Sequence, residues 1–364
     1  MRTIGAVCVF FGTTVLTGAW AAPPPGSAVR ILSPRFFPGW QSQNVCYPFV
    51  VPEQAGTYRM FYTGSASEQW NESNAEQWVT GYVTSTDTIT WKFPENYEQV
   101  LFARQFMEAD LVDPAEMAAV FDSMFAAGAC VIKEGGVYKA WYTGWNGEFV
   151  HQGGGLCDKI NFRVGYATSP DGIRWTKVAG TAGAGSVLGL GSTGEPDAKG
   201  AANPHVLKIG GEHRMWYEGY DGQTRRIMLA TSADGITWTK QGVVLNPGGA
   251  NAKDERGLAN PMVIFRSGQY ELWYQGKSQS SPNYHVLRAT STDDAAWTKI
   301  AAEVTLHPDS PIAGSELIHV NSAIVLADGS VQVFFAKQIT TARTVAYATL
   351  NSRNFHVYTE VVNP

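Results

Sequence analysis

The chain has 364 residues, of which 44% are hydrophobic and 16% are charged, and its formal net charge is −5 at pH 7. This composition excludes a lone small module and a disordered chain, because enough apolar material is present to build a large core. Acidic residues outnumber basic residues and no basic run occurs, so nucleic acid is not an expected partner. The 38 Gly, 18 Pro and 12 Trp residues favour many short strands joined by tight turns.

The first 21 residues have the pattern of a secretory signal. Arg2 supplies the positive charge, residues 4–20 form an apolar and small-residue stretch, and Ala19-Trp20-Ala21 offers a cleavage site. A membrane anchor is the alternative, but the stretch is short and contains several Gly and Thr residues. We therefore expect residues 22–364 to be a single secreted or periplasmic domain, a monomer with no membrane span once the signal is removed.

Cysteines are few. Removal of the signal would take Cys8 with it and leave Cys46, Cys130 and Cys157. An odd number of cysteines in a compartment that permits disulfides predicts one pair and one free thiol, without saying which residues form the pair. No CxxC spacing occurs, so a zinc site built on cysteine is not expected.

One phrase recurs along the chain: an apolar strand, a turn, an aromatic strand and a third strand that ends in the pattern S-x-D-x-x-x-W. We expect the apolar strands at residues 49–51, 130–132, 205–207, 262–264 and 323–325. The aromatic strands follow at residues 58–64, 138–144, 213–219, 270–276 and 331–336. The S-x-D-x-x-x-W turns lie at residues 85–91, 169–175, 232–238 and 291–297.

Each unit therefore predicts four antiparallel strands, and five such units predict an all-β fold, a five-bladed β-propeller of four-stranded antiparallel blades. In each S-x-D-x-x-x-W turn, we expect the Asp to bond the backbone of its own turn and the Trp to pack between adjacent sheets. The insertions at residues 65–77 and 146–159 are expected to be surface loops, where functional residues concentrate.

The phrases MWYEG, ATSADGITW and NPHVL resemble the five-bladed propeller glycosidases, the clan of arabinanases, β-xylosidases, invertases and levansucrases. The resemblance covers essentially all of the chain after the signal. It implies a glycosidase that hydrolyses or transfers a glycosyl group in the central depression, with three carboxylates at positions that fall on Tyr47-Pro48, Cys130 and Ala202. None of these residues is a carboxylate, so the resemblance marks the fold more than the chemistry.

Three other acids recur at one offset, nine residues before the central Val of an apolar strand: Asp122, Asp197 and Asp254. Equal offsets in a cyclic repeat predict that all three lie on one rim. Glycoside hydrolysis needs one protonated and one ionised carboxyl group, and acids crowded in a cleft supply that division. These three are therefore the candidate catalytic residues; the alternative is that each Asp caps the turn that enters its strand.

The candidate substrate-binding residues flank these positions and are Trp40, Tyr47, Glu195, Asn203, His205, Arg256, Asn260, Glu316, His319 and Asn321. The three Asn share one repeat position, and two of them precede Pro, so a backbone role is the alternative to a ligand contact. The two His either bind a sugar hydroxyl, act as an acid, or simply pack. Four Trp lie outside the repeated positions and either stack on sugar rings or cover loops: Trp40, Trp70, Trp78 and Trp145.

No cofactor is required by this chemistry, although a calcium ion held by rim or turn oxygens stays an open possibility. The sequence contains no GxSxG elbow, HExxH helix or P-loop. The leading hypothesis is a glycoside hydrolase that acts on a carbohydrate by two-carboxylate acid/base catalysis. The alternative is a propeller that binds a carbohydrate or another small polar ligand without catalysis.

Overall fold

The computed structural model describes residues 28–33, 44–54, 56–65, 78–95, 99–101, 120–147, 149–151, 157–159, 161–280, 284–304, 306, 318–345 and 348–362. The expected signal at residues 1–21, together with Trp40, Trp70 and Glu316, lies outside these ranges. Within them, no helix has the length and apolar character needed to cross a membrane.

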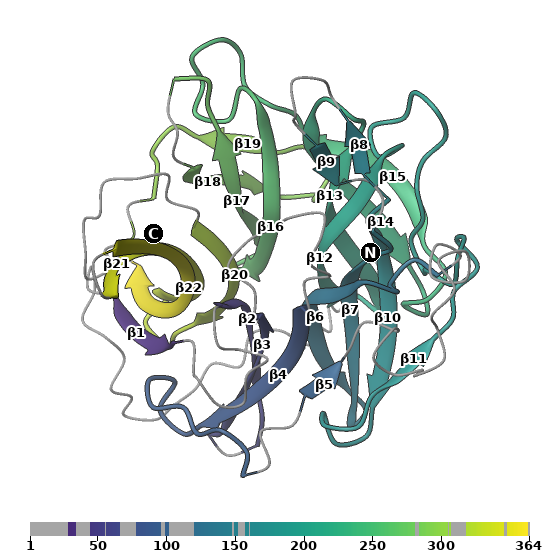
Figure 1. The fold of residues 1–364 in the computed structure, drawn as a ribbon. Helices are drawn as coiled ribbons and strands as arrows, with labels where there is room; N and C mark the ends of the chain where they lie inside the picture. The colour runs from purple at the N-terminus through teal and green to yellow at the C-terminus, as the bar shows by residue number, and fades with distance from the viewer. Residues whose placement is uncertain are drawn as a thin grey trace.

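The described residues form antiparallel sheets (Figure 1). One sheet contains β2 (Asn44–Pro52), β3 (Tyr58–Ser65), β4 (Trp78–Ser85) and β5 (Gln99–Leu101). The next contains β6 (Phe125–Glu134), β7 (Val137–Trp145), β10 (Arg163–Ser169) and β11 (Thr176–Val178). The last contains β20 (Ile318–Val325), β21 (Val331–Val345), β22 (Ala348–Val362) and β1 (Val29–Leu32). A separate hairpin pairs β8 (Phe149–His151) with β9 (Cys157–Lys159).

An eight-stranded sheet lies between these in the sequence and consists of two four-stranded halves. Its first half contains β12 (Gly200–Ile209), β13 (Glu212–Tyr220), β14 (Arg225–Ser232) and β15 (Thr239–Leu245). Its second half contains β16 (Gly257–Arg266), β17 (Gln269–Lys277), β18 (Tyr284–Ser291) and β19 (Thr298–Ile300). A single parallel residue pair, Arg225 with Gly257, joins the halves. The expected all-β class and four-stranded antiparallel units are therefore confirmed.

The first strands of the units lie next to one another. Strand β2 contacts β6, β6 contacts β12, β12 contacts β16, β16 contacts β20, and β20 contacts β2 again. Figure 1 shows these strands around the middle of the molecule, with the other strands of each unit further out. The arrangement is propeller-like, and it brings residues from five distant parts of the sequence to one central place.

The S-x-D-x-x-x-W turns have the expected local role. In the turn of β14, the Asp234 carboxylate accepts the backbone N–H groups of Ile236 and Thr237 at 2.8 Å each. These hydrogen bonds lower the pKa of Asp234 to about 2. The other three turns make the same pair of bonds, through Asp87, Asp171 and Asp293.

The Trp of each turn packs on the aromatic strand of a neighbouring unit, as expected. Trp238 lies edge-on to Trp141 with ring centroids 6.1 Å apart, and Trp297 lies edge-on to Trp216 at 6.4 Å. Trp91, from the first sheet, packs in the same way on Phe334 of the last sheet at 6.4 Å. The contact that joins consecutive units therefore also joins the last unit to the first.

The expected disulfide is wrong for the two cysteines whose side chains are described. Cys46 and Cys130 are both free, buried thiols. Each lies on the first strand of a different unit, where its side chain packs among apolar neighbours rather than against the other sulfur. The side chain of Cys157 lies outside the described residues.

Candidate functional site

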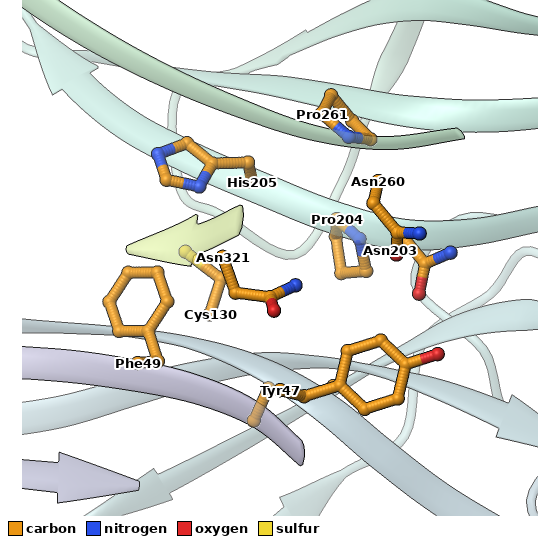
Figure 2. Close-up of a pocket in the computed structure, with 11 residues that line it drawn as sticks. Tyr47, Phe49, Cys130, Asn203, Pro204, His205, Asn260, Pro261 and Asn321 are labelled. Atoms are coloured by element: carbon orange, nitrogen blue, oxygen red, sulfur yellow. The ribbon is translucent and has the colours of Figure 1, made fainter. Parts of the chain in front are cut away.

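A pocket lies where the first strands meet (Figure 2). Its inner space of about 20 Å³ admits a water-sized group such as a hydroxyl, and its wider mouth is open to solvent. All five first strands contribute to its wall, and the lining residues are Tyr47, Phe49, Gly128, Ala129, Cys130, Asn203, Pro204, His205, Asn260, Pro261 and Asn321. The structure therefore brings together five of the predicted binding residues, namely Tyr47, Asn203, His205, Asn260 and Asn321.

A bulge in each first strand turns side chains toward this pocket. The strand pairing skips residues between Cys46 and Phe49 in β2, and the other four first strands show the same irregularity. Tyr47 has φ 50°, Asn203 has φ 51° and Asn260 has φ 50°. Asn tolerates this left-handed conformation, whereas Tyr rarely adopts it. Strained backbone of this kind is concentrated at functional sites.

The Asn260 side chain organises one side of the pocket. Its Nδ2 donates to Oε1 of Gln275 at 3.0 Å and to Nδ1 of His319 at 2.8 Å, so both amide hydrogens are used. Its Oδ1 is buried and has no hydrogen-bond partner among the described residues, and the same holds for Oδ1 of Asn321. A buried amide oxygen without a partner is unfavourable, so both atoms favour a ligand or water that donates a hydrogen bond.

A carboxylate lies one hydrogen bond from another residue of the pocket wall. Nδ2 of Asn203 donates to Oε2 of Glu218 at 2.9 Å, and the other oxygen of Glu218 forms an ion pair with Arg225. Glu218 is 4% exposed. Burial raises the pKa of the Tyr47 hydroxyl, the charge of Glu218 adds to that rise, and Arg225 opposes it. Tyr47 is therefore a neutral hydrogen-bonding group at neutral pH.

Both predicted histidines are buried and neutral. Burial lowers the pKa of His205 to about 4 and that of His319 to about 4. His205 donates from Nε2 to the backbone oxygen of Val263 at 2.9 Å, because a carbonyl can only accept. The His319 ring lies 5.3 Å from the Tyr47 ring. His319 therefore supports the pocket from behind Asn260 and Tyr47 rather than lining it.

Cys130 lines the pocket at one of the positions where the resemblance implies a carboxylate. Its sulfur accepts the backbone N–H of Val206 at 3.2 Å. Burial raises the pKa of this thiol to about 12, so the thiolate is not available at neutral pH. Its role in this structure is to join two neighbouring first strands.

The three predicted catalytic Asp residues occupy equivalent places, but none of them lines the pocket. Each is almost fully buried. Each accepts a hydrogen bond from a Tyr of the second strand of its own unit and forms an ion pair with a Lys of the outer strand of that unit. The tyrosine bonds measure 2.8 Å for Asp122, 2.9 Å for Asp197 and 3.1 Å for Asp254. The lysines are Lys177 at 2.6 Å, Lys240 at 2.7 Å and Lys299 at 2.5 Å, respectively.

These clusters lie on the other face of the second strand from the pocket. Tyr217, which bonds Asp197, directly precedes Glu218 in β13, and consecutive side chains of a strand point to opposite faces. The equal sequence offset thus identified structurally equivalent residues. That one of these residues contacts the substrate stays a prediction.

The remaining predicted residues are placed less centrally. Glu195 and Arg256 lie in the segments before β12 and β16 and do not line the pocket. Trp78 and Trp145 are both buried and pack on Phe125 and Phe162, respectively, at ring distances of 6.2 and 6.0 Å. These two Trp therefore cover the interior of the sheets. Trp40 and Glu316 lie outside the described residues.

The sequence reasoning missed the polar residues of the second strands that lie beside the pocket. Glu218 and Gln275 bond the pocket residues Asn203 and Asn260, and the hydroxyl of Thr143 accepts the backbone N–H of Asn203 at 2.8 Å. The signal was present in the repeat, because a polar residue stands between the aromatic pair and the Gly in FYTG, WYTG, WYEG and WYQG.

The described residues contain no group of three His, Cys, Asp or Glu side chains that could hold a metal ion. Backbone carbonyls also bind calcium, and the possible calcium ion stays a prediction.

Comparison with solved structures relates the whole architecture to carbohydrate-active proteins. A member of the GH130 family of mannoside phosphorylases, which contains glycoside hydrolases that target β-1,2 mannosidic linkages in Candida mannan, is 17% identical, with a TM-score of 0.59 over 96% of this chain and 99% of that chain. Zg3597, a family 117 glycoside hydrolase from Zobellia galactanivorans, is 15% identical, with a TM-score of 0.58 over 92% of this chain and 89% of that chain. The chain shares the fold of these glycoside hydrolases. They are of the five-bladed β-propeller type, and the predicted resemblance is confirmed at the level of the fold.

An α-L-arabinofuranosidase from Lactobacillus brevis is similar to the same degree, with 16% identity and a TM-score of 0.58 over 89% of this chain and 92% of that chain. No family model matches the chain. The uncharacterized protein Rv1502 of Mycobacterium tuberculosis is 26% identical over 52% of this chain, which spans 60% of that protein's length. A 1,2-β-oligomannan phosphorylase of Thermoanaerobacter sp. is 33% identical over 23% of this chain and 27% of its own length.

Proposed function

We propose that this protein is a secreted glycan-acting enzyme, a glycoside hydrolase or a phosphorylase, that holds a sugar in the central pocket of a five-bladed β-propeller. In this proposal residues 22–364 form one domain after cleavage of residues 1–21. The fold shared with glycoside hydrolases and the ring of contacting first strands support the proposal.

One observation carries the proposal: the pocket presents uncharged hydrogen-bonding groups backed by a buried carboxylate. The amide oxygens of Asn260 and Asn321 lack donors, the Tyr47 hydroxyl is neutral, and Glu218 lies directly beyond Asn203. A sugar carries many hydroxyl groups, which are both donors and acceptors, and therefore complements such a wall. An apolar ligand would leave these polar atoms unsatisfied.

Catalysis in this proposal uses two carboxyl groups, one as acid and one as base or nucleophile. Glu218 is the first, because it is the carboxylate bonded to a pocket residue. The second is one of the predicted acids Asp122, Asp197, Asp254 and Glu316. For the three Asp, engagement of the substrate requires a change in the Tyr and Lys contacts that now hold them.

A second candidate function is glycan binding without catalysis. The observation that favours it is the absence of Asp and Glu among the pocket-lining residues of the described chain. Tyr47, Cys130 and Ala202 occupy the positions at which the resemblance implies carboxylates, and the Cys130 thiol stays protonated.

The two functions are separated by incubating the protein with arabinofuranosyl, xylosyl, fructosyl and mannosyl oligosaccharides, each with and without inorganic phosphate and a chelator. An enzyme releases a sugar, or a sugar phosphate if it is a phosphorylase. A binding protein releases nothing, yet one oligosaccharide raises its free energy of unfolding by RT ln(1 + [L]/Kd) and so raises its melting temperature. Neither product nor thermal shift with any member of the panel would contradict both functions.

A further inference from the structure

A group of cations lies along the strand ends beyond the pocket. Arg225 begins β14, Arg256 directly precedes β16, and Lys277 ends β17. Strand pairing brings them together, because Gly257 pairs with Arg225 on one side and with Lys277 on the other. Gly257 is three residues from the pocket residue Asn260, which is about 10 Å along a strand. We call Arg225, Arg256 and Lys277 the cationic cluster.

The cationic cluster brings three cations close to one another, beside the carboxylates of Glu218 and Glu255. Arg225 forms an ion pair with Glu218. Arg256 is exposed, and its guanidinium makes no ion pair with any residue that the structure describes. The neighbouring Glu255 is also negatively charged, but its oxygens accept the backbone N–H groups of Gln279 at 2.5 Å and Asn251 at 2.7 Å rather than pairing with Arg256.

The cations of the cluster influence one another and a shared tyrosine. Burial and the Arg256 guanidinium lower the pKa of Lys277, which indicates repulsion between these two charges. Burial raises the pKa of Tyr284, and both Arg225 and Arg256 oppose that rise. An anion bound between these groups would relieve the repulsion.

Aromatic rings lie beside the charges. The guanidinium carbon of Arg225 is 4.3 Å from the centre of the Tyr220 ring, and Nζ of Lys277 is 4.5 Å from the centre of the Tyr284 ring. Tyr284 pairs with Lys277 across β17 and β18. Cation–π contacts therefore hold two cations of the cluster in place over ring faces, where an anion can approach them from the other side.

We propose that the cationic cluster binds the carboxylate of an acidic sugar unit, with Arg256 as its main ligand. The inference rests on the proposed function and specifies its substrate class: a glycan that contains uronic acid, with one unit in the pocket and the acidic unit at the cluster. Arg256 supplies a planar pair of N–H donors that matches a carboxylate.

The test compares pairs of oligosaccharides that differ only in charge. Glucuronoxylan, pectin and alginate oligosaccharides are titrated into the protein beside the same oligosaccharides after carboxyl reduction, and affinity is measured by calorimetry. We expect at least one acidic form to bind about tenfold more tightly than its reduced form, the loss expected for one charge-assisted contact. This preference disappears in Arg256→Gln. Arg174→Gln, which removes an arginine whose side chain is 90% exposed at the opposite strand ends, keeps it.

Three results would overturn the inference. Equal affinity for acidic and reduced forms would remove the acidic subsite but leave the proposed function standing. Competition by inorganic phosphate, together with a requirement for phosphate in turnover, would assign the cluster to phosphate instead. Binding of neither form, with no turnover of the neutral panel, would contradict the proposed function as well.

Discussion

Individual residues in and beside the pocket are held in states that would be unfavourable on their own. Tyr47 has a left-handed backbone at φ 50°, and the Asn260 amide oxygen is buried without a donor. Glu218 is a buried carboxylate whose charge is balanced by one partly exposed arginine. Packing of the neighbouring sheets holds these residues in place despite the cost. A binding site for a polar ligand requires several such groups around one pocket.

The first residue-scale prediction concerns Glu218→Gln. This substitution keeps an acceptor for Asn203 but removes the charge and the proton-transfer ability. We expect kcat to fall by about 10²- to 10⁴-fold, the usual contribution of a general acid or base, with a much smaller change in KM. Steady-state kinetics on the substrate found in the panel provide the measurement.

A matched control is Glu212→Gln, because Glu212 lies at the other end of the same strand, with a side chain that is 45% exposed and an ion pair to Arg214. Its kinetics should equal those of the wild type. Unchanged kcat in Glu218→Gln would remove this residue from the reaction.

A second residue-scale prediction concerns Asp122. Its side chain is 1% exposed and contacts Lys177 at 2.6 Å and the Tyr142 hydroxyl at 2.8 Å. Asp122→Asn leaves the lysine without its carboxylate, and we expect a loss of about 3 kcal/mol of stability in urea unfolding. If Asp122 is also the second catalytic carboxyl, kcat of the folded variant falls as well. Full stability would contradict the structural role of the cluster.

At the scale of elements, the turns and the N-terminal strand connect the sheets. The Trp of each turn packs on a neighbouring sheet, and Trp91 joins the first sheet to the last. The backbone N–H of Val50 also donates to Ser322 Oγ at 3.0 Å, between the first strands of those two sheets. Strand β1 supplies the fourth strand of the last sheet, although it comes from the opposite end of the described sequence.

The element-scale prediction concerns β1. Leu32 is 3% exposed and packs in a cluster with Phe334 and Val357. Leu32→Ala should destabilise the protein by about 2–5 kcal/mol, the usual range for a buried leucine. Val137→Ala, at a strand residue that is 38% exposed, should change the stability by less than about 0.5 kcal/mol.

Hydrogen exchange gives an independent measurement of the same element. The backbone N–H groups of β1 that point toward β22 should be protected from exchange, whereas those that point away from it should exchange faster, because β1 is the edge strand of its sheet. Rapid exchange throughout β1 would show that the last sheet does not depend on it.

Much of this element-scale organisation could be predicted from the sequence. The aromatic strands and the S-x-D-x-x-x-W turns carry local signals, since strand alternation and an Asp that bonds its own turn need only nearby residues. The first strands begin several residues earlier than predicted, because a bulge at Tyr47, Asn203 or Asn260 interrupts the pattern of side chains.

The site was harder to predict, because it is assembled from contacts between distant segments. The equal offsets of Asp122, Asp197 and Asp254 correctly indicated equivalent places in the fold. They did not indicate the lysines that form ion pairs with these carboxylates. Glu218 stands in a second strand, and only strand pairing and the bulge at Asn203 show that it lies beside the pocket.

At the scale of the whole molecule, buried histidines between the units link stability to pH. The pKa values of His205 and His319 are lowered to about 4, whereas an unfolded histidine has a pKa of about 6.5. Between these values the unfolded chain binds protons that the folded protein does not. Their contribution is therefore fully present above about pH 7 and decreases as the pH falls toward 4.

We predict that the urea midpoint falls when the pH is lowered from 7.5 to 5. In His205→Gln the decrease should be smaller, because one of the described histidines with a lowered pKa is removed and Gln can still donate to the backbone oxygen of Val263. A midpoint that does not change over this range in the wild type would contradict the burial of these histidines in neutral form.

The central claim is that a sugar is processed in the pocket between the first strands. Its most direct test is product release from the oligosaccharide panel by the wild type, by Asn321→Trp, which fills the pocket, and by Gln241→Trp, which adds the same side chain at an exposed position on β15. The account predicts release by the wild type and Gln241→Trp and none by a folded Asn321→Trp. Equal release by all three proteins would place the reaction elsewhere and contradict the account.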